Sequence, residues 1–167
     1  MGTSLEDLRM LQAVEKVADE IWEQAARWNA FAKSTVGEQL NRAVDSIGAN
    51  IAESFGRFHY GEKLNFLYYA RGSLFETKYW FNRVLSRNLM PPQQIQNYAD
   101  ELTNLARQIN AFTNSLKAQR NSTQQVRETP TLYVTNEEDI SHPLFNELEL
   151  QWLQTLPNDT QSPISNL

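Results

Sequence analysis

The sequence GEQLNRAVDSIGANIAESFGR, residues 37–57, has the spacing of a helix with three different faces. Its apolar face consists of Leu40, Val44, Ile47, Ile51 and Phe55. Its polar face consists of Gln39, Arg42, Ser46, Asn50, Glu53 and Arg57. Between them lie the small residues Gly48, Ala49, Ala52 and Gly56. Because a surface helix needs only one apolar face, we expect this helix to be contacted from more than one direction.

The polar face lacks the Lys and Glu pairs that are typical of a helix surface in water. Gln39, Ser46 and Asn50 occupy it instead, and Ser and Asn have lower helix propensity than Ala or Leu. This composition indicates a hydrogen-bond network that is buried or lies at a subunit interface. The alternative interpretation is an ordinary solvated face.

A second helix with three faces is expected at residues 62–88. Its core face contains Leu67, Ala70, Leu74, Phe81 and Leu85. Its polar face, the counterpart of the first, contains Asn65, Tyr69, Gly72, Glu76, Trp80 and Arg83. Its remaining face alternates the rings of Tyr68, Phe75 and Tyr79 with the cations Arg71 and Lys78. Such a face can stack bases and pair phosphates; alternatively, a neighbouring subunit covers the rings and the cations lie at its rim.

Two further amphipathic segments complete the core. The first helix is expected at about residues 5–30, and the last at about 92–119 after Pro91 and Pro92. Four helices of similar length with short connections predict an all-α, up-down four-helix bundle. We assign residues 1–120 to this domain.

Residues 121–167 form an acidic C-terminal extension. They contain one basic and seven acidic residues, whereas residues 1–120 contain 14 basic and 13 acidic ones. Within the extension, Phe145, Leu148, Trp152 and Leu156 recur at helical spacing and predict a short helix at about 143–156. Because an apolar stripe of this kind is seldom left bare in water, we expect the helix to dock on its own bundle or on a partner.

The carboxylates of Glu53 and Glu76 lie on the two polar faces. Nothing in the sequence indicates a substrate pocket beside them, so a catalytic pair is not favoured. A carboxylate held inside or between bundles must be paired with a cation or hydrogen-bonded. Arg42, Arg57 and Arg83 are the candidate partners.

The remaining motifs argue against an enzyme. The chain has no cysteine, no Glu-x-x-His pair, no phosphate-binding glycine loop and no GxSxG motif. We therefore expect no catalytic residue, no metal, no cofactor and no small-molecule substrate. The lack of cysteine, of a signal peptide and of a membrane-spanning apolar run favours a soluble protein of the cytoplasm without a membrane partner.

Two motifs resemble a known family. The segments QLNRAVDSIGANIAESFGR at residues 39–57 and FLYYARGSLFE at residues 66–76 resemble the signature of the bacterial four-helix bundle proteins. That family was first noticed as reading frames in intervening sequences of large-subunit ribosomal RNA genes, and it includes the accessory variability determinants of diversity-generating retroelements. The resemblance covers about residues 5–118.

The resemblance implies a homopentamer around a central channel. It also implies a non-catalytic accessory scaffold that binds a reverse transcriptase and its RNA in a diversity-generating retroelement. An alternative that the residues leave open is a protein-protein interaction module of the intervening-sequence type without direct nucleic-acid binding. The bundle is nearly neutral and so differs from the markedly basic retroelement members.

Overall fold

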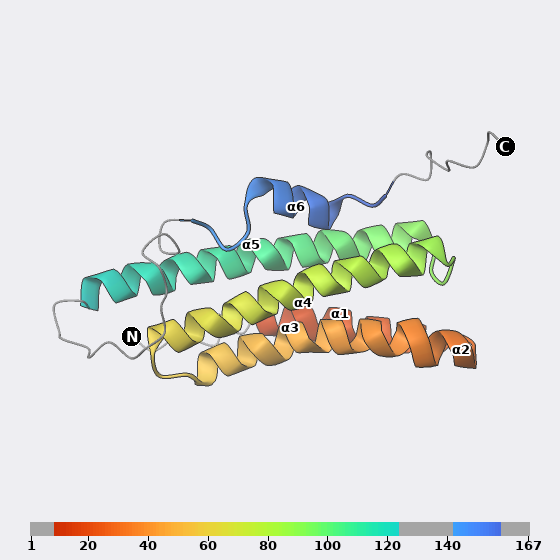
Figure 1. Ribbon diagram of the computed structural model, residues 1–167, viewed down its shortest axis with the longest axis horizontal. Helices are drawn as coiled ribbons and strands as arrows, with labels where there is room; N and C mark the ends of the chain where they lie inside the picture. Colours follow the sequence, from red (N-terminus) through yellow and green to blue (C-terminus); the bar gives the residue numbers. More distant parts are fainter. Residues whose placement is uncertain (1–8, 124–141, 158–167) are drawn as a thin grey trace.

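The computed structural model describes residues 9–123 and 142–157, and within these ranges it consists of helices and the turns between them, without a strand. The bundle helices are α1 (Arg9–Ala25), α3 (Glu38–Gly56), α4 (Tyr60–Ser86) and α5 (Pro92–Thr123). Each runs antiparallel to the one before it, as Figure 1 shows. This arrangement confirms the predicted all-α up-down bundle. The expected beginning of the first helix at residues 5–8 and most of the acidic extension lie outside the described residues.

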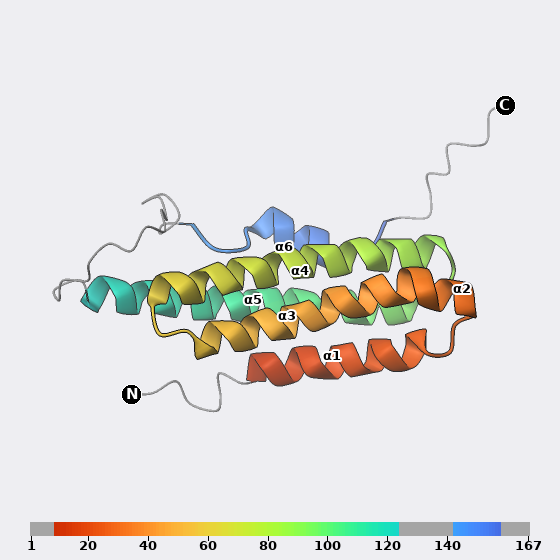
Figure 2. The same cartoon turned by 60° about the horizontal axis from the view of Figure 1, so that its bottom comes forward.

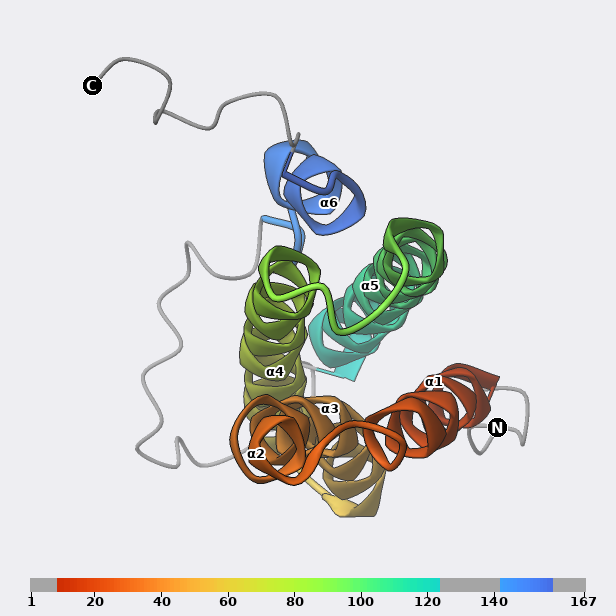
Figure 3. The same ribbon diagram turned by 90° about the vertical axis from the view of Figure 1, so that its right-hand side faces the viewer.

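The bundle closes around one core. α1 packs against α3 and α5, and α4 packs against α3 and α5, so each bundle helix has two neighbours (Figure 3). Leu40, Val44, Ile47 and Ile51 of the predicted apolar face are fully buried. Phe55, the last residue of that face, is half-buried and stacks on Phe112 with ring centres 5.2 Å apart.

The connection between α1 and α3 differs from the prediction. The first helix ends at Ala25, and helical structure resumes as α2 (Ala30–Ala32), continues through a π-helical turn, η2 (Lys33–Gly37), and joins α3. Asn29 begins this run because its side chain accepts a hydrogen bond of 2.9 Å from the Ala32 N–H. The helical run that contains residues 37–57 therefore begins earlier than the sequence pattern indicated, at Ala30.

The other two turns are short. α3 and α4 are separated by residues 57–59, which form the turn at one end of the bundle (Figure 2). Before α5, Asn88 adopts a left-handed backbone conformation with φ of 52°, which asparagine tolerates better than most residues. Pro92 then opens α5 at the position where its missing N–H has no helical partner.

The C-terminal helix α6 (Glu147–Gln154) lies on the outside of the bundle, along α4 and α5 (Figures 1 and 3). The segment before it descends along the last turns of α5, so the extension runs antiparallel to that helix. None of the described helices is long and apolar enough to cross a membrane.

Candidate interaction surfaces on helix α4

The surface between α4 and α5 holds the C-terminal segment in an apolar groove. Phe145 is fully buried and stacks on Phe75 of α4, with ring centres 6.0 Å apart. Trp152 stacks on the same Phe75 ring at 5.3 Å. Leu150 and Leu153 of α6 are also buried. We call this surface the α4/α5 groove.

Polar side chains of the groove bind the main chain before α6. Arg71 Nε donates to the Leu144 carbonyl at 2.8 Å. Asn110 of α5 makes two bonds to Phe145: its Nδ2 donates to the carbonyl at 2.7 Å, and its Oδ1 accepts from the N–H at 2.7 Å. Lys117 Nζ donates to the His142 carbonyl at 2.9 Å. These bonds fix the position of the segment without depending on its side chains.

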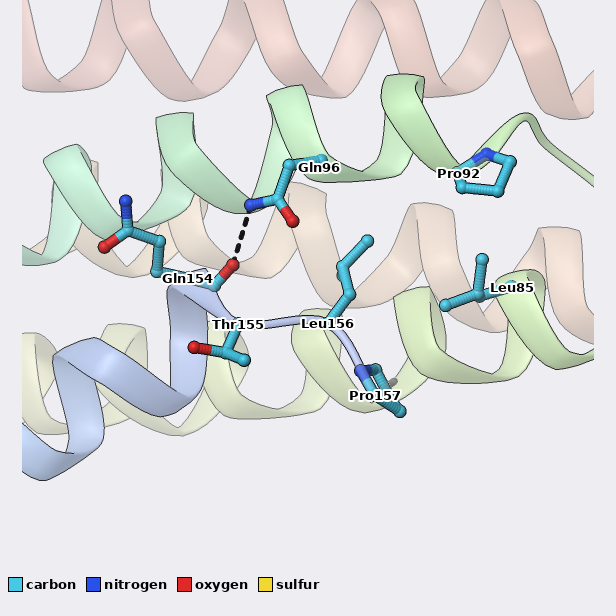
Figure 4. A pocket seen from close by; sticks show the side chains of 7 residues that line it. All are labelled: Leu85, Pro92, Gln96, Gln154, Thr155, Leu156 and Pro157. Carbon is cyan, nitrogen blue, oxygen red and sulfur yellow. Dashed lines mark hydrogen bonds between the residues drawn. The ribbon is translucent and has the colours of Figure 1, made fainter. Parts of the chain in front are cut away.

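A similar pair of bonds holds the end of α6. Gln96 Nε2 donates to the Gln154 carbonyl at 2.8 Å, as Figure 4 shows. Lys78 Nζ donates to the Thr155 carbonyl at 2.7 Å. The last carbonyls of a helix have no partners within it and carry partial negative charge. The groove therefore supplies the donors that the end of α6 lacks.

One ion pair joins the groove to an α6 side chain. Arg71 pairs with Glu149, and its guanidinium also lies 4.8 Å from the centre of the Phe75 ring. Glu149 closes a capping box with Asn146, because each side chain accepts from the other residue's N–H, at 2.9 and 3.0 Å. Glu149 thus stabilises both the start of α6 and its docking.

Lys78 is the most deeply buried charge of the groove, since its side chain is 0% exposed. Its ammonium lies 5.9 Å from the centre of the Trp152 ring. Burial lowers the pKa of Lys78 from 10.5 to about 8. No carboxylate within the described part of the chain forms an ion pair with it.

The second surface is the one that α3 and α4 share. Asn50 joins the two helices, because its Nδ2 donates to the Ser46 carbonyl at 2.8 Å and lies 3.5 Å from Ser73 Oγ. Glu53 pairs with Arg57 one helical turn away. Arg42 and Glu76 are exposed on the same side. In the single chain, neither Glu53 nor Glu76 is buried.

Aromatic rings gather where this face meets the α3–α4 turn. The Arg57 guanidinium lies 4.6 Å from the centre of the Phe66 ring, and Phe66 meets Tyr69 edge to face at 5.7 Å. Phe58 is 88% exposed and Tyr69 is 60% exposed. We call Arg57, Phe58, Phe66 and Tyr69 the aromatic patch. Large exposed rings beside an arginine are typical of protein interfaces.

The comparison with protein families decides the membership of this chain. A family model described as "23S rRNA-intervening sequence protein" matches residues 6–111. The chain belongs to the 23S rRNA-intervening sequence protein family. This finding confirms the resemblance that the two sequence motifs indicated. No curated protein matches the chain.

The part of the chain that the family model matches ends within α5. Residues 112–123, the end of α5, and the docked segment 142–157 lie beyond the matched range. The groove residues of α4 and Asn110 lie within it, whereas the segment that fills the groove does not. No group of three or more His, Asp or Glu side chains in the described ranges could hold a metal ion.

The aromatic and basic face predicted on α4 is divided in this family member. Arg71, Phe75 and Lys78 lie in the groove beneath the C-terminal segment. Tyr79 is 51% exposed and its ring lies 5.8 Å from the Arg83 guanidinium. Tyr68 is half-buried. With the segment docked, these five side chains therefore do not form one continuous exposed surface.

In the single chain, the residues of the two predicted polar faces are half-buried or exposed. Gln39, Ser46, Asn50, Asn65 and Arg83 are half-buried. The aromatic patch adds Phe58 and Phe66, which sequence reasoning missed. Phe66 directly follows Asn65 in the sequence, so it lies about 100° further around the helix and falls outside the spacing that defined the polar face.

The docking stripe differs from the prediction in register. α6 begins at Glu147, four residues later than expected, because the Asn146 capping box sets its start. Leu148 consequently points away from the bundle and is 76% exposed, and Trp152 is 42% exposed. Phe145 is buried and Leu156 is half-buried as docked residues. Leu150 and Leu153 were missed; the Asn-x-x-Glu spacing at 146–149 was the signal for them.

Proposed function

We propose that this protein is a non-catalytic oligomeric interaction scaffold whose subunits meet through the face shared by α3 and α4. The aromatic patch carries this proposal. Phe58 and Tyr69 expose large rings, and the Arg57 guanidinium lies over the Phe66 ring that meets Tyr69. Exposed apolar surface rimmed by polar groups marks interaction sites. The polar side chains of the face, such as Asn50 and Glu76, would fix the register between subunits.

The proposed assembly is a homopentamer, as the family resemblance implies. Light scattering measures the mass of the full chain and of the variants Phe58→Asp and Tyr69→Asp. We expect a mass near five chains for the parent and a loss of assembly in both variants, because a charge in the interface core is costly. Phe31→Asp is the matched control, since Phe31 is 78% exposed at the far end of the bundle on α2 (Figure 1).

A parent chain that is monomeric would contradict the proposal. Dissociation by Phe31→Asp, with assembly kept in Phe58→Asp and Tyr69→Asp, would place the interface at the other end of the bundle. Circular dichroism on each variant distinguishes lost assembly from lost folding, since the helical signal of the bundle would persist.

The partner that we favour for this scaffold is a protein. In the structure, the groove residues Arg71 and Lys78 bind a polypeptide segment, and α6 covers the Phe75 ring. This agrees with a protein-protein interaction module without direct nucleic-acid binding. The observation that favours this candidate is that a polypeptide segment, residues 142–157, occupies the α4/α5 groove.

The second candidate is an accessory subunit that binds a reverse transcriptase and its RNA. The observation in its favour is the chemistry that α6 covers: Arg71, Phe75 and Lys78 offer two cations and a ring to an RNA strand when the segment leaves. Phe145→Asp in the full chain weakens docking and uncovers them. RNA affinity that rises in Phe145→Asp and falls steeply with salt would support this candidate, whereas no RNA binding in either form would exclude it.

A further inference from the structure

Besides the side chains of Phe145, Leu153 and Glu149, the groove binds main-chain atoms of the docked segment. Gln96 and Lys78 both donate to main-chain carbonyls at the C-terminal end of α6. Asn110 binds only the main chain of Phe145. The bonds of Gln96 and Lys78 are available to any helical segment that ends at this position in the same direction.

The docked segment does not use the full hydrogen-bonding capacity and charge of Lys78. A lysine ammonium has three donors and a full charge, and the Thr155 carbonyl offers only a partial charge in return. A buried ion is strongly stabilised only when an opposite charge pairs with it. The groove therefore holds a buried cation whose best ligand is an anion at the position of the Thr155 carbonyl.

A chain that ended at this position would supply such an anion without moving the main chain. One oxygen of its terminal carboxylate would occupy the place of the Thr155 carbonyl oxygen, and the other the place of the next peptide nitrogen. In the docked chain, Leu156 and Pro157 continue from this point and line an open pocket together with Leu85, Pro92 and Gln96 (Figure 4). A chain that ended at position 155 would leave the place of Leu156 and Pro157 empty.

The present occupant fits the groove only in part. Leu148 and Trp152 are 76% and 42% exposed, although both are large apolar residues of the docked segment. Arg71 is paired with a carboxylate of α6, that of Glu149, whereas Lys78 bonds to a main-chain carbonyl. A second helix that offers a carboxylate to each of the two cations would bind more tightly.

We propose that the α4/α5 groove is a binding site for the C-terminal helix of a partner protein, with the partner's terminal carboxylate on Lys78 and an acidic residue on Arg71. The chain's own segment 142–157 is then the occupant that the partner displaces. This inference names the partner chemistry of the proposed scaffold, but it rests on the groove alone and not on the α3/α4 interface.

The test compares two peptides that differ in one group. Both have the sequence of residues 142–155, HPLFNELELQWLQT; one ends in a free carboxylate and the other in a carboxamide. The receptor is the full chain carrying Phe145→Asp, which weakens its own segment and leaves every groove residue unchanged. Fluorescence anisotropy at pH 7 gives the two dissociation constants.

We expect the free carboxylate to bind about tenfold more tightly than the carboxamide, because a charge-assisted bond replaces a neutral acceptor. Lys78→Met in the receptor should abolish this difference. Gln96→Ala is the matched control: it removes the donor to Gln154, weakens both peptides, and leaves the ratio of their affinities unchanged.

Equal affinities of the two peptides for the receptor with Lys78 intact would overturn the proposal, and this comparison needs no variant of Lys78. An RNA oligonucleotide that binds the uncovered groove more tightly than either peptide would also overturn it, in favour of a nucleic-acid surface. Light scattering on the same samples reports the oligomeric state separately, so a monomer that discriminates between the peptides would contradict only the proposed assembly.

Discussion

Lys78 and Thr155, 77 positions apart in the chain, are joined by a hydrogen bond of 2.7 Å from the lysine ammonium to the threonine carbonyl. The bond ties the middle of α4 to the residue that follows α6. Because the ammonium is enclosed by this contact, its protonation and the docking of the C-terminal segment are linked. Docking is therefore expected to respond to pH.

The stability of the docked segment should increase as pH rises above about 8. The docked form has a lowered Lys78 pKa of about 8, whereas an uncovered lysine keeps a pKa near 10.5. Below pH 8 the charge is present in both forms and its burial opposes docking; between pH 8 and 10.5 the docked form loses the proton first, so docking strengthens. Thermal unfolding followed by tryptophan fluorescence, between pH 7 and 9.5, measures the effect.

Two further points make this pH series specific. Burial raises the pKa of Tyr98 above its usual value of 10, so its ionisation opposes folding only above the range tested. Lys78→Met should flatten the pH dependence because it removes the titrating group. An equally steep increase in stability in Lys78→Met would assign the effect to another residue.

Glu149→Gln should loosen the C-terminal segment by about 1–2 kcal/mol, because it removes the charge that pairs with the partly buried Arg71. Glutamine can still accept the capping bond from the Asn146 N–H, so α6 keeps its start. Hydrogen exchange of residues 144–157 reports the change. Glu147→Gln is the control: Glu147 is exposed in the first turn of α6, and its loss should cost only a few tenths of a kcal/mol.

Leu153→Ala should weaken docking by about 2–4 kcal/mol, because Leu153 is fully buried against the bundle. Leu148→Ala should change it by less than about 0.5 kcal/mol, because that side chain points to solvent. Limited proteolysis after the bundle, compared between the two variants, measures docking. The opposite ranking would mean that α6 binds in the register with Leu148 inward.

Asn29→Ala should destabilise the bundle by about 1 kcal/mol, because it removes the side-chain acceptor for the Ala32 N–H at the start of α2. Urea unfolding gives the free energy. Lys33→Ala, an exposed position one turn later, should leave the unfolding free energy within about 0.5 kcal/mol of the parent. No loss of stability in Asn29→Ala would mean that the π-helical turn does not depend on this cap.

Helical periodicity predicted the core because the burial of Leu40, Ile47 and Ile51 depends on their own spacing. It missed the start of the second helix run, because a π-helical turn at residues 33–37 breaks the 3.6-residue period between Phe31 and Leu40. The cap formed by Asn29 sets where the run starts, and the spacing of apolar residues carries no information about a cap.

The placement of Lys78 could not be predicted in the same way. On its own helix it alternates with aromatic residues and fits an exposed basic face. Its burial depends on Trp152 and Thr155, which reach it only after the chain has folded back along α5. Contacts between residues so far apart are set by tertiary packing, and no spacing within residues 62–88 reports them.

The eight residues of α6 are too few to hold a helix by themselves, since isolated helices shorter than about 12–15 residues are marginal in water. When the segment leaves the groove, it must therefore also melt, and a partner that takes its place converts part of this chain from helix to coil. Docking in the groove and folding of α6 therefore occur together. When a partner with a preformed helix binds, far-ultraviolet circular dichroism would register a small loss of helix, because α6 of this chain unfolds.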